Sequence, residues 1–258
     1  MIPYFTFPTF ELGPMTIQIW GLLAALGFLI GAKTASIRLL RSGSDFALTS
    51  LLPGLMFVGL LGARLGYLII YSDWLQNPNP LEILKINDGG MSFFGGLIAG
   101  VIYLYFKLKP LPPRDRKIII DALAFGWPVG EGVARIGCFL VHDHPGIATT
   151  LPWGVLYPDG IIRHDLGLEL AVLLLLLAIG FALMERRQPQ PVGTYLPLAL
   201  IAYGLMRLLT DPLRIEPVTY WHQPAGVWLG GLTLIIGLTM WITNRRKIRK
   251  AGTIQVDN

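Results

Sequence analysis

The sequence contains few charged residues. They make up 14% of its 258 residues, whereas a soluble domain contains about 25%. Apolar residues make up 53%, and the mean hydropathy is +0.57. This composition excludes an ordinary soluble globular protein and predicts an integral membrane protein.

Cysteine and internal repeats are also scarce. The single cysteine, Cys138, excludes an intramolecular disulfide framework. The sequence shows no fixed-period repeat, and no stretch between its apolar runs is long enough for a separate soluble domain. We expect no cleaved signal peptide, because residues 1–10 lack a basic region and no small-residue cleavage site follows the first apolar run. The sequence therefore predicts one transmembrane domain over residues 1–258.

Apolar segments recur along the whole chain. Each is close to the roughly 17–25 residues that an α-helix needs to cross a bilayer. The connectors between them are rich in Pro, Asn, Asp and Gly, which do not continue a helix. We predict an all-α membrane protein with seven transmembrane helices, over residues 16–40, 47–71, 90–106, 118–141, 166–184, 194–209 and 226–243.

Basic residues lie in every second connection and predict the orientation. Cytoplasmic loops carry an excess of Lys and Arg, so these connections are expected inside and the N-terminus outside. The C-terminal run RRKIRK is expected to anchor on anionic lipid, with no nucleic-acid partner. The basic connections contain Arg38 and Arg41, the cluster from Lys107 to Lys117, Arg186 and Arg187, and the cluster from Arg245 to Lys250.

Arginines also lie within or at the ends of apolar spans: Arg64, Arg135 and Arg207. An isolated charge at the bilayer centre costs about 3 kcal/mol on insertion scales. One such residue alone is typical of snorkelling or helix pairing. All three fall towards the outer ends of their predicted spans, with Arg163 and Arg214 in outer loops. They favour a cavity open to the outer leaflet, and the rigid guanidinium fork matches the phosphate of an anionic phospholipid.

Glycines in GLLGARLGY, DGGMSFFGG and GWPVGEGVARIGCF are typical of close helix packing in lipid. Glu131 lies in the same predicted span as Arg135, four residues before it. A membrane carboxylate needs a partner, so we expect these two side chains to pair.

The order of several motifs resembles that of the prolipoprotein diacylglyceryl transferases. The motifs are GARLGY, DGGMSFFGG, GVARIGCF, RHDLGLEL and YGLMRLLTDPLR, and they extend over nearly the whole chain. The resemblance implies a multi-pass enzyme of the bacterial inner membrane that uses no cofactor. Such an enzyme moves the diacylglyceryl group of phosphatidylglycerol onto the lipobox cysteine of a prolipoprotein and releases glycerol 1-phosphate.

The resemblance also implies roles for individual residues. Arg135 and Arg207 correspond to family arginines that we expect to hold the lipid phosphate and stabilise the departing glycerol phosphate. Asp211 stands where the family has glutamate and is expected to orient Arg207. The residues expected to contact substrate are Arg64, Gly95, Gly96, Gly146, His164, Asp211 and Arg214.

The sequence departs from the family pattern at several polar positions. Phe94 replaces a histidine proposed to handle a proton, Cys138 and Val141 replace asparagines, and Trp20 and Gln18 stand where the family has tyrosine and histidine. Two alternatives therefore stay open at this point. Beside transfer to a prolipoprotein, the chain is then a divergent transferase with another acceptor or a non-catalytic phospholipid-binding protein.

The sequence VHDHPG supplies histidines of its own. Our hypothesis is that His142 or His144 replaces the missing family histidine as the proton acceptor. The alternatives are loop histidines that bind backbone or lipid headgroups, or a zinc site that includes His164. We predict no metal site. Cys138 is interpreted as a small packed residue and not as a covalent nucleophile.

Overall fold

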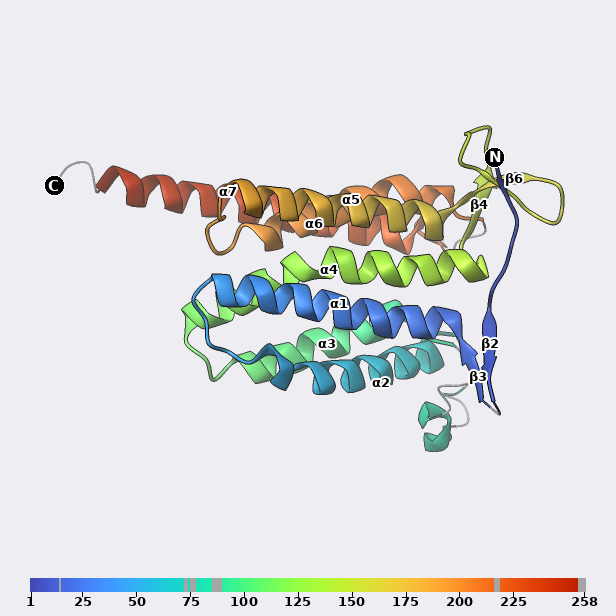
Figure 1. The fold of residues 1–258 in the computed structure, drawn as a ribbon, viewed down its shortest axis with the longest axis horizontal. Coiled ribbons are helices and arrows are strands. Elements are labelled where there is room, and N and C mark those ends of the chain that lie inside the picture. Colours follow the sequence, from blue (N-terminus) through green and yellow to red (C-terminus); the bar gives the residue numbers. More distant parts are fainter. Residues whose placement is uncertain (14, 72–73, 75–77, 85–89, 216–218, 255–258) are drawn as a thin grey trace. The chain divides into compact units, whose positions relative to one another are not determined.

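The computed structural model describes residues 1–254, apart from residues 14, 72–73, 75–77, 85–89 and 216–218. Its backbone is predominantly helical over this part of the chain, as the sequence predicts. The α-helices are α1 (Ile19–Arg41), α2 (Leu52–Tyr71), α3 (Phe93–Leu108), α4 (Pro113–Val141), α5 (Leu166–Arg187), α6 (Tyr195–Thr210) and α7 (Ala225–Ile254). Each overlaps one of the seven predicted segments (Figure 1).

Several helical stretches are long and apolar enough to cross a membrane. Among the described residues there are five, namely Ile19–Arg41, Leu48–Ile70, Leu166–Arg187, Tyr195–Leu213 and Ala225–Arg246. Helix α3 contributes a shorter apolar stretch, Gly95–Leu108. Helix α4 is long, but it carries Asp121, Glu131 and Arg135. The protein is therefore a multi-pass integral membrane protein.

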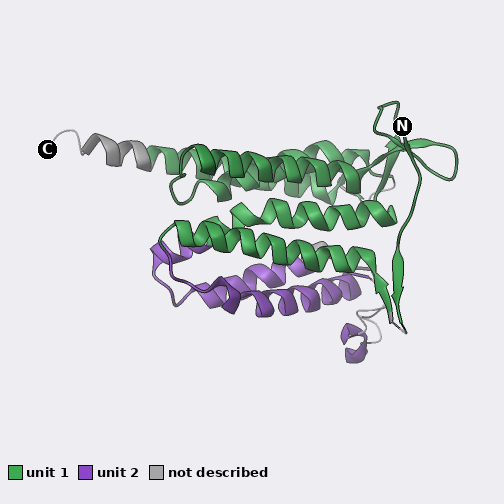
Figure 2. Ribbon diagram, viewed as in Figure 1, with its two compact units in different colours: residues 1–43, 120–258 green, residues 44–119 purple. Residues whose placement is uncertain are grey.

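The chain forms two compact units (Figure 2). The first contains residues 1–43 and 120–258, and the second contains residues 44–119. Whether both belong to one transmembrane domain stays a prediction. The second unit is built from α2 and α3, which pack through glycines: a Cβ at Gly66 would lie 2.7 Å from the Cα of Gly95, and one at Gly96 would lie 3.1 Å from the oxygen of Gly59. The predicted close packing by small residues is confirmed here.

Glycines also bring α1 and α4 together in the first unit. A Cβ at Gly31 would lie 3.0 Å from the oxygen of Gly126, and one at Gly130 would lie 2.8 Å from the oxygen of Gly27. The two backbones are therefore nearly in contact, and no larger side chain fits between them.

Short strands form a small sheet where α4 ends and α5 begins (Figure 1). The strand order is β1 (Ile2–Pro3), β5 (Val155–Leu156), β6 (Ile162–Asp165) and β4 (Pro145–Ala148). Two hairpins complete the described strands: β2 (Thr9–Leu12) with β3 (Met15–Gln18), and β7 (Thr219–Tyr220) with β8 (Gln223–Pro224). The N-terminus and the loop after α4 thus share one sheet.

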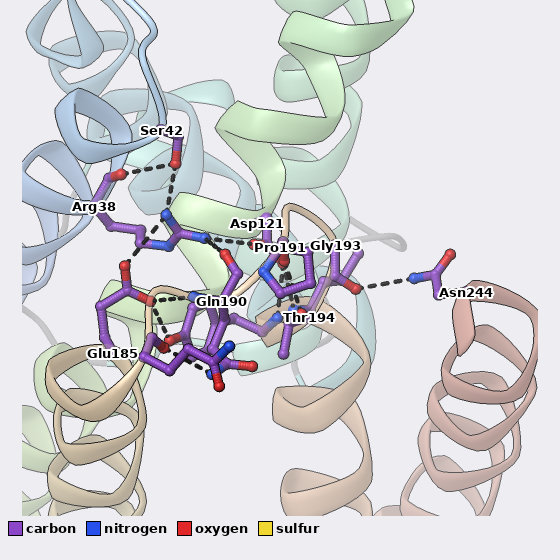
Figure 3. A network of polar contacts seen from close by, with 12 residues as sticks. Arg38, Ser42, Asp121, Glu185, Gln190, Pro191, Gly193, Thr194 and Asn244 are labelled. Atoms are coloured by element: carbon purple, nitrogen blue, oxygen red, sulfur yellow. Dashed lines mark hydrogen bonds and ion pairs between the residues drawn. The ribbon is translucent and has the colours of Figure 1, made fainter. Parts of the chain in front are cut away.

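A buried polar network lies in the first unit, close to the C-terminal ends of α1 and α5 (Figure 3). Arg38 donates from Nη1 to Ser42 Oγ at 2.7 Å and from Nη2 to the oxygen of Gln190 at 2.8 Å. The same guanidinium lies 3.5 Å from a Glu185 oxygen and 3.8 Å from an Asp121 oxygen. All three charged side chains are nearly inaccessible to solvent. They tie α1, α4 and α5 together.

Asp121 also caps the N-terminal end of helix α6. Its Oδ1 accepts hydrogen bonds from the backbone nitrogens of Tyr195 at 2.8 Å and Leu196 at 3.1 Å. Thr194, the residue at the N-cap position, makes no capping hydrogen bond with its own side chain. A carboxylate from α4 thus satisfies the free N–H groups of α6, a role that a residue of the same helix usually has.

Candidate arginine-lined site

Arg135 is held by its own helix. Its Nε donates to Glu131 Oε1 at 2.9 Å, one helical turn earlier in α4. The expected pairing is therefore confirmed. A guanidinium has five N–H donors, and this carboxylate uses only part of them. The pairing fixes the direction of the side chain and compensates its charge within an apolar helix.

Arg207 and Arg214 share one buried carboxylate. Asp211 is 1% exposed; its Oδ2 lies 2.8 Å from Arg207 Nη2, and its Oδ1 accepts from Arg214 Nε at 3.0 Å. The expected contact between Asp211 and Arg207 is present. Asp211 begins a short 3₁₀ helix, Asp211–Leu213, directly after α6, which brings Arg214 back towards Arg207.

The charges of both arginine groups act on His144. Burial, together with the positive charges of Arg135, Arg214 and Arg207, lowers the pKa of His144 to about 3. The imidazole is therefore neutral near pH 7 and can accept a proton. Its side chain is 26% exposed, and its Nε2 lies 3.8 Å from Asp143 Oδ1. His144 thus combines partial access with a field of guanidinium groups.

Asp143 and Cys138 lie beside His144. Potential ligand atoms of these three residues are within 4.8 Å of one another, which makes them the candidate metal group found among the described residues. Burial raises the pKa of Asp143. The guanidinium charges that act on His144 also repel a divalent cation, so we interpret the group as neighbouring polar side chains and not as a metal site. The zinc alternative placed His164 in such a group, but His164 Nδ1 lies 2.6 Å from Glu169 Oε1.

His142 has different surroundings, although it is only two residues away. Its side chain is 1% exposed, with Nδ1 2.6 Å from Asp165 Oδ2 and Nε2 2.8 Å from the oxygen of Phe5. The ring stacks on Tyr4 at 4.4 Å. Both hydrogen-bond partners are acceptors, so only a doubly protonated ring can donate to both. His142 thus holds the N-terminal segment against the loop, and a role as proton acceptor stays a prediction.

Asp165 organises this buried cluster. It accepts hydrogen bonds from Tyr157 Oη at 3.0 Å and from the backbone nitrogen of Leu168 at 3.0 Å, which caps α5. Burial and the Asp165 charge raise the pKa of Tyr157. These contacts of Asp165 and Tyr157 were not predicted from the sequence. An aspartate directly before an apolar helix is a recognisable N-cap, and that pattern could have identified Asp165.

Gly146 allows two segments to approach closely. A Cβ there would lie 2.7 Å from the Cβ of His164 and 2.9 Å from the oxygen of Leu213. Gly146 also forms a β-bridge with Arg214. The glycine thus joins the loop that carries His144 to the segment that carries Arg214. Its expected role in substrate binding stays a prediction, as does that of His164.

The remaining predicted residues, Arg64, Gly95 and Gly96, belong to the second unit. Arg64 is 6% exposed, and it donates to the oxygens of Glu82 at 3.0 Å and Gly90 at 3.3 Å. The two glycines contact α2, as described above. These contacts stabilise the pair of helices, and a contact with substrate stays a prediction. The side chain of Phe94 lies outside the described residues.

The fold and the site define a multi-pass membrane protein in which the charges of carboxylate-paired arginines act on a neutral histidine. A family model described as prolipoprotein diacylglyceryl transferase matches residues 8–243. The chain belongs to the prolipoprotein diacylglyceryl transferase family, as the sequence motifs predict.

Relatives support the same assignment over nearly the full length. The phosphatidylglycerol–prolipoprotein diacylglyceryl transferase of Cupriavidus necator is 32% identical over 98% of this chain and 97% of its own length. The protein of that name from Pseudoalteromonas atlantica is 31% identical over 96% and 95%. That from Pasteurella multocida is 33% identical over 83% and 82%.

Proposed function

We propose that the protein transfers the diacylglyceryl group of phosphatidylglycerol to the thiol of a prolipoprotein lipobox cysteine. The acceptor sulfur attacks the carbon of the diacylglyceryl group that bears the phosphate. A carbon–sulfur bond forms, and the bond between that carbon and the phosphate oxygen breaks. Glycerol 1-phosphate leaves, and the thiol proton passes to a base. The observation that carries this proposal is that Asp211 pairs with both Arg207 and Arg214, and that a β-bridge joins Arg214 to Gly146 in the loop that carries His144, in a member of this family.

The arginines are suited to the leaving group. Negative charge grows on the phosphate as the carbon–oxygen bond breaks, and fixed cations near that position lower the barrier. Glu131 and Asp211 keep Arg135 and Arg207 oriented before substrate binds, which reduces the reorganisation required during the reaction.

His144 is the proposed proton acceptor, in place of the histidine that Phe94 replaces. In the free site burial and, in addition, the guanidinium charges hold its pKa low, at about 3. The phosphate of a bound phospholipid compensates those charges, so its binding raises the pKa of His144 towards the range in which a base acts at neutral pH. Binding of the donor lipid would thus prepare the base for the acceptor thiol.

We expect His144→Ala to lower kcat by about 10²- to 10⁴-fold, the usual range for loss of a general base. His144 must be neutral to accept a proton, so wild-type kcat should fall as pH decreases through the pKa of His144 in the lipid-bound enzyme. In His144→Ala this acidic limb should be absent. The measurement is the pH dependence of peptide modification in detergent micelles that contain phosphatidylglycerol.

The matched variant is His142→Ala. It removes the buried contacts to Asp165 and Phe5, so its main effect should be a lower melting temperature, with the acidic limb retained. If His144→Ala kept wild-type kcat while His142→Ala lost it, the assignment of the base would be wrong.

We further propose seven spans in the bacterial inner membrane, with the N-terminus outside and the C-terminus in the cytoplasm. The alternating basic connections support this orientation. In a Cys138→Ser background, a membrane-impermeant maleimide should label Asp159→Cys in spheroplasts prepared from intact cells, and should label Asn258→Cys only after the inner membrane is permeabilised. The reverse pattern would refute the orientation.

A further inference from the structure

Helix α7 contacts Arg207 through glycines. A Cβ at Gly230 would lie 3.0 Å from the Cβ of Arg207, and one at Gly226 would lie 2.5 Å from Arg207 Nη2. The two glycines are four residues apart, so they lie on one face of the helix. The side chain of Arg207 therefore packs against the face of α7 that Gly226 and Gly230 form, where neither residue has a side chain.

Gly226 differs from Gly230 in what it faces. A Cβ at Gly230 would also lie 3.0 Å from the oxygen of Gly204, which is ordinary close packing of α6 against α7. A Cβ at Gly226 would instead overlap the carboxylate of Asp211. The neighbours of Gly226 are thus the two charged groups whose pairing fixes Arg207.

The carboxylate cannot easily move away from an added methyl group. Asp211 is 1% exposed, and its two oxygens are already engaged by Arg207 and Arg214. It also lies at the first turn of α7, where the helix dipole favours a negative charge. A side chain at position 226 would displace the carboxylate from both arginines.

We infer that Gly226 is a positioning residue for the phosphate site. The absence of a side chain at this position lets the Asp211–Arg207 pair lie against the start of α7, with the guanidinium held in a single orientation. This inference rests on the proposed function, because it assigns the held arginine to the phosphate of phosphatidylglycerol.

Gly226→Ala tests the inference, with Gly231→Ala as the matched control. Both variants add one methyl group to α7, and a Cβ at Gly231 has nothing within 4 Å. We expect Gly226→Ala to raise the KM for phosphatidylglycerol about tenfold, in line with displacement of one charged contact. The KM for the lipobox peptide should not change. A smaller folded fraction would lower the maximal rate alone and leave both KM values unchanged.

A double-mutant cycle separates positioning from folding. Once Asp211→Ala has removed the carboxylate, adding Gly226→Ala should raise the KM for phosphatidylglycerol by much less than in the wild-type background, because only the contact with Arg207 Nη2 remains. Independent effects that multiply would overturn the inference, as would equal KM values for Gly226→Ala and Gly231→Ala. If Gly226→Ala alone does not fold, the comparison of Asp211→Ala with the double variant still decides.

Failure of the proposed function would give a different result, because the wild-type protein itself would transfer nothing. The inference would then be judged by binding of labelled phosphatidylglycerol to the purified protein. Weaker binding by Gly226→Ala than by Gly231→Ala would support it, and equal binding would overturn it.

Discussion

Arg207→Ala should lower the rate of diacylglyceryl transfer by about 10²- to 10³-fold, the range found when a donor to a developing anion is removed. The substitution removes a guanidinium that Asp211 holds at 2.8 Å. It also leaves Asp211 buried with Arg214 as its remaining arginine partner. Both effects weaken the positive field at the proposed phosphate position. Initial rates with labelled phosphatidylglycerol and a lipobox peptide measure the loss.

Two variants define the cause of this loss. Arg207→Lys keeps the charge but not the planar fork, so its rate should lie between those of wild type and Arg207→Ala. Arg187→Ala removes an exposed arginine at the C-terminal end of α5 and should stay within twofold of wild type, as expected for a surface charge with little coupling. Full activity in Arg207→Ala would exclude Arg207 from the reaction.

Asp121→Ala should lower the free energy of unfolding by about 3–5 kcal/mol, the range for removal of one partner from a buried ion pair. It leaves Arg38 with Glu185 as its remaining carboxylate at 3.5 Å. It also removes the acceptor for the first N–H groups of α6. Unfolding of the detergent-solubilised protein, followed by circular dichroism, measures the change.

Asp121→Asn separates charge from capping. Its amide oxygen can still accept from Tyr195 and Leu196, so this variant should retain part of the stability that Asp121→Ala loses. Asp159 pairs with Arg163 on the surface, and Asp159→Ala should give no measurable change. If Asp121→Ala unfolded at the same midpoint as Asp159→Ala, the buried network would contribute nothing to stability.

Hydropathy predicted the helices because lipid imposes long apolar runs, and all seven predicted segments overlap helices in the structure. The helix boundaries differ from the predicted ones where residues at a helix end favour an earlier or later start. Helix α4 begins at Pro113, five residues before the predicted segment, because proline suits the first helical turn and Asp115 follows it there. The sheet formed by β1, β4, β5 and β6 was not predicted, because strands of two to four residues are too short to show a period.

The site was predictable where its geometry is local. Glu131 and Arg135 are one turn apart on a helix, so their pairing followed from spacing alone. The two histidines could not be distinguished in this way. His142 has a backbone φ of 49° and is buried against Asp165, whereas the charges of three arginines act on His144. Gly226 was missed because its importance depends on how α7 packs against the end of α6.

The most direct test of the central claim is mass spectrometry of a lipobox peptide after incubation with the purified protein and phosphatidylglycerol. The proposed function predicts a diacylglyceryl thioether on the peptide cysteine, with glycerol 1-phosphate released in equal amount. A peptide with serine in place of that cysteine should stay unmodified. An unmodified cysteine peptide, under conditions in which the folded protein binds phosphatidylglycerol, would contradict the claim and indicate another acceptor or lipid binding alone.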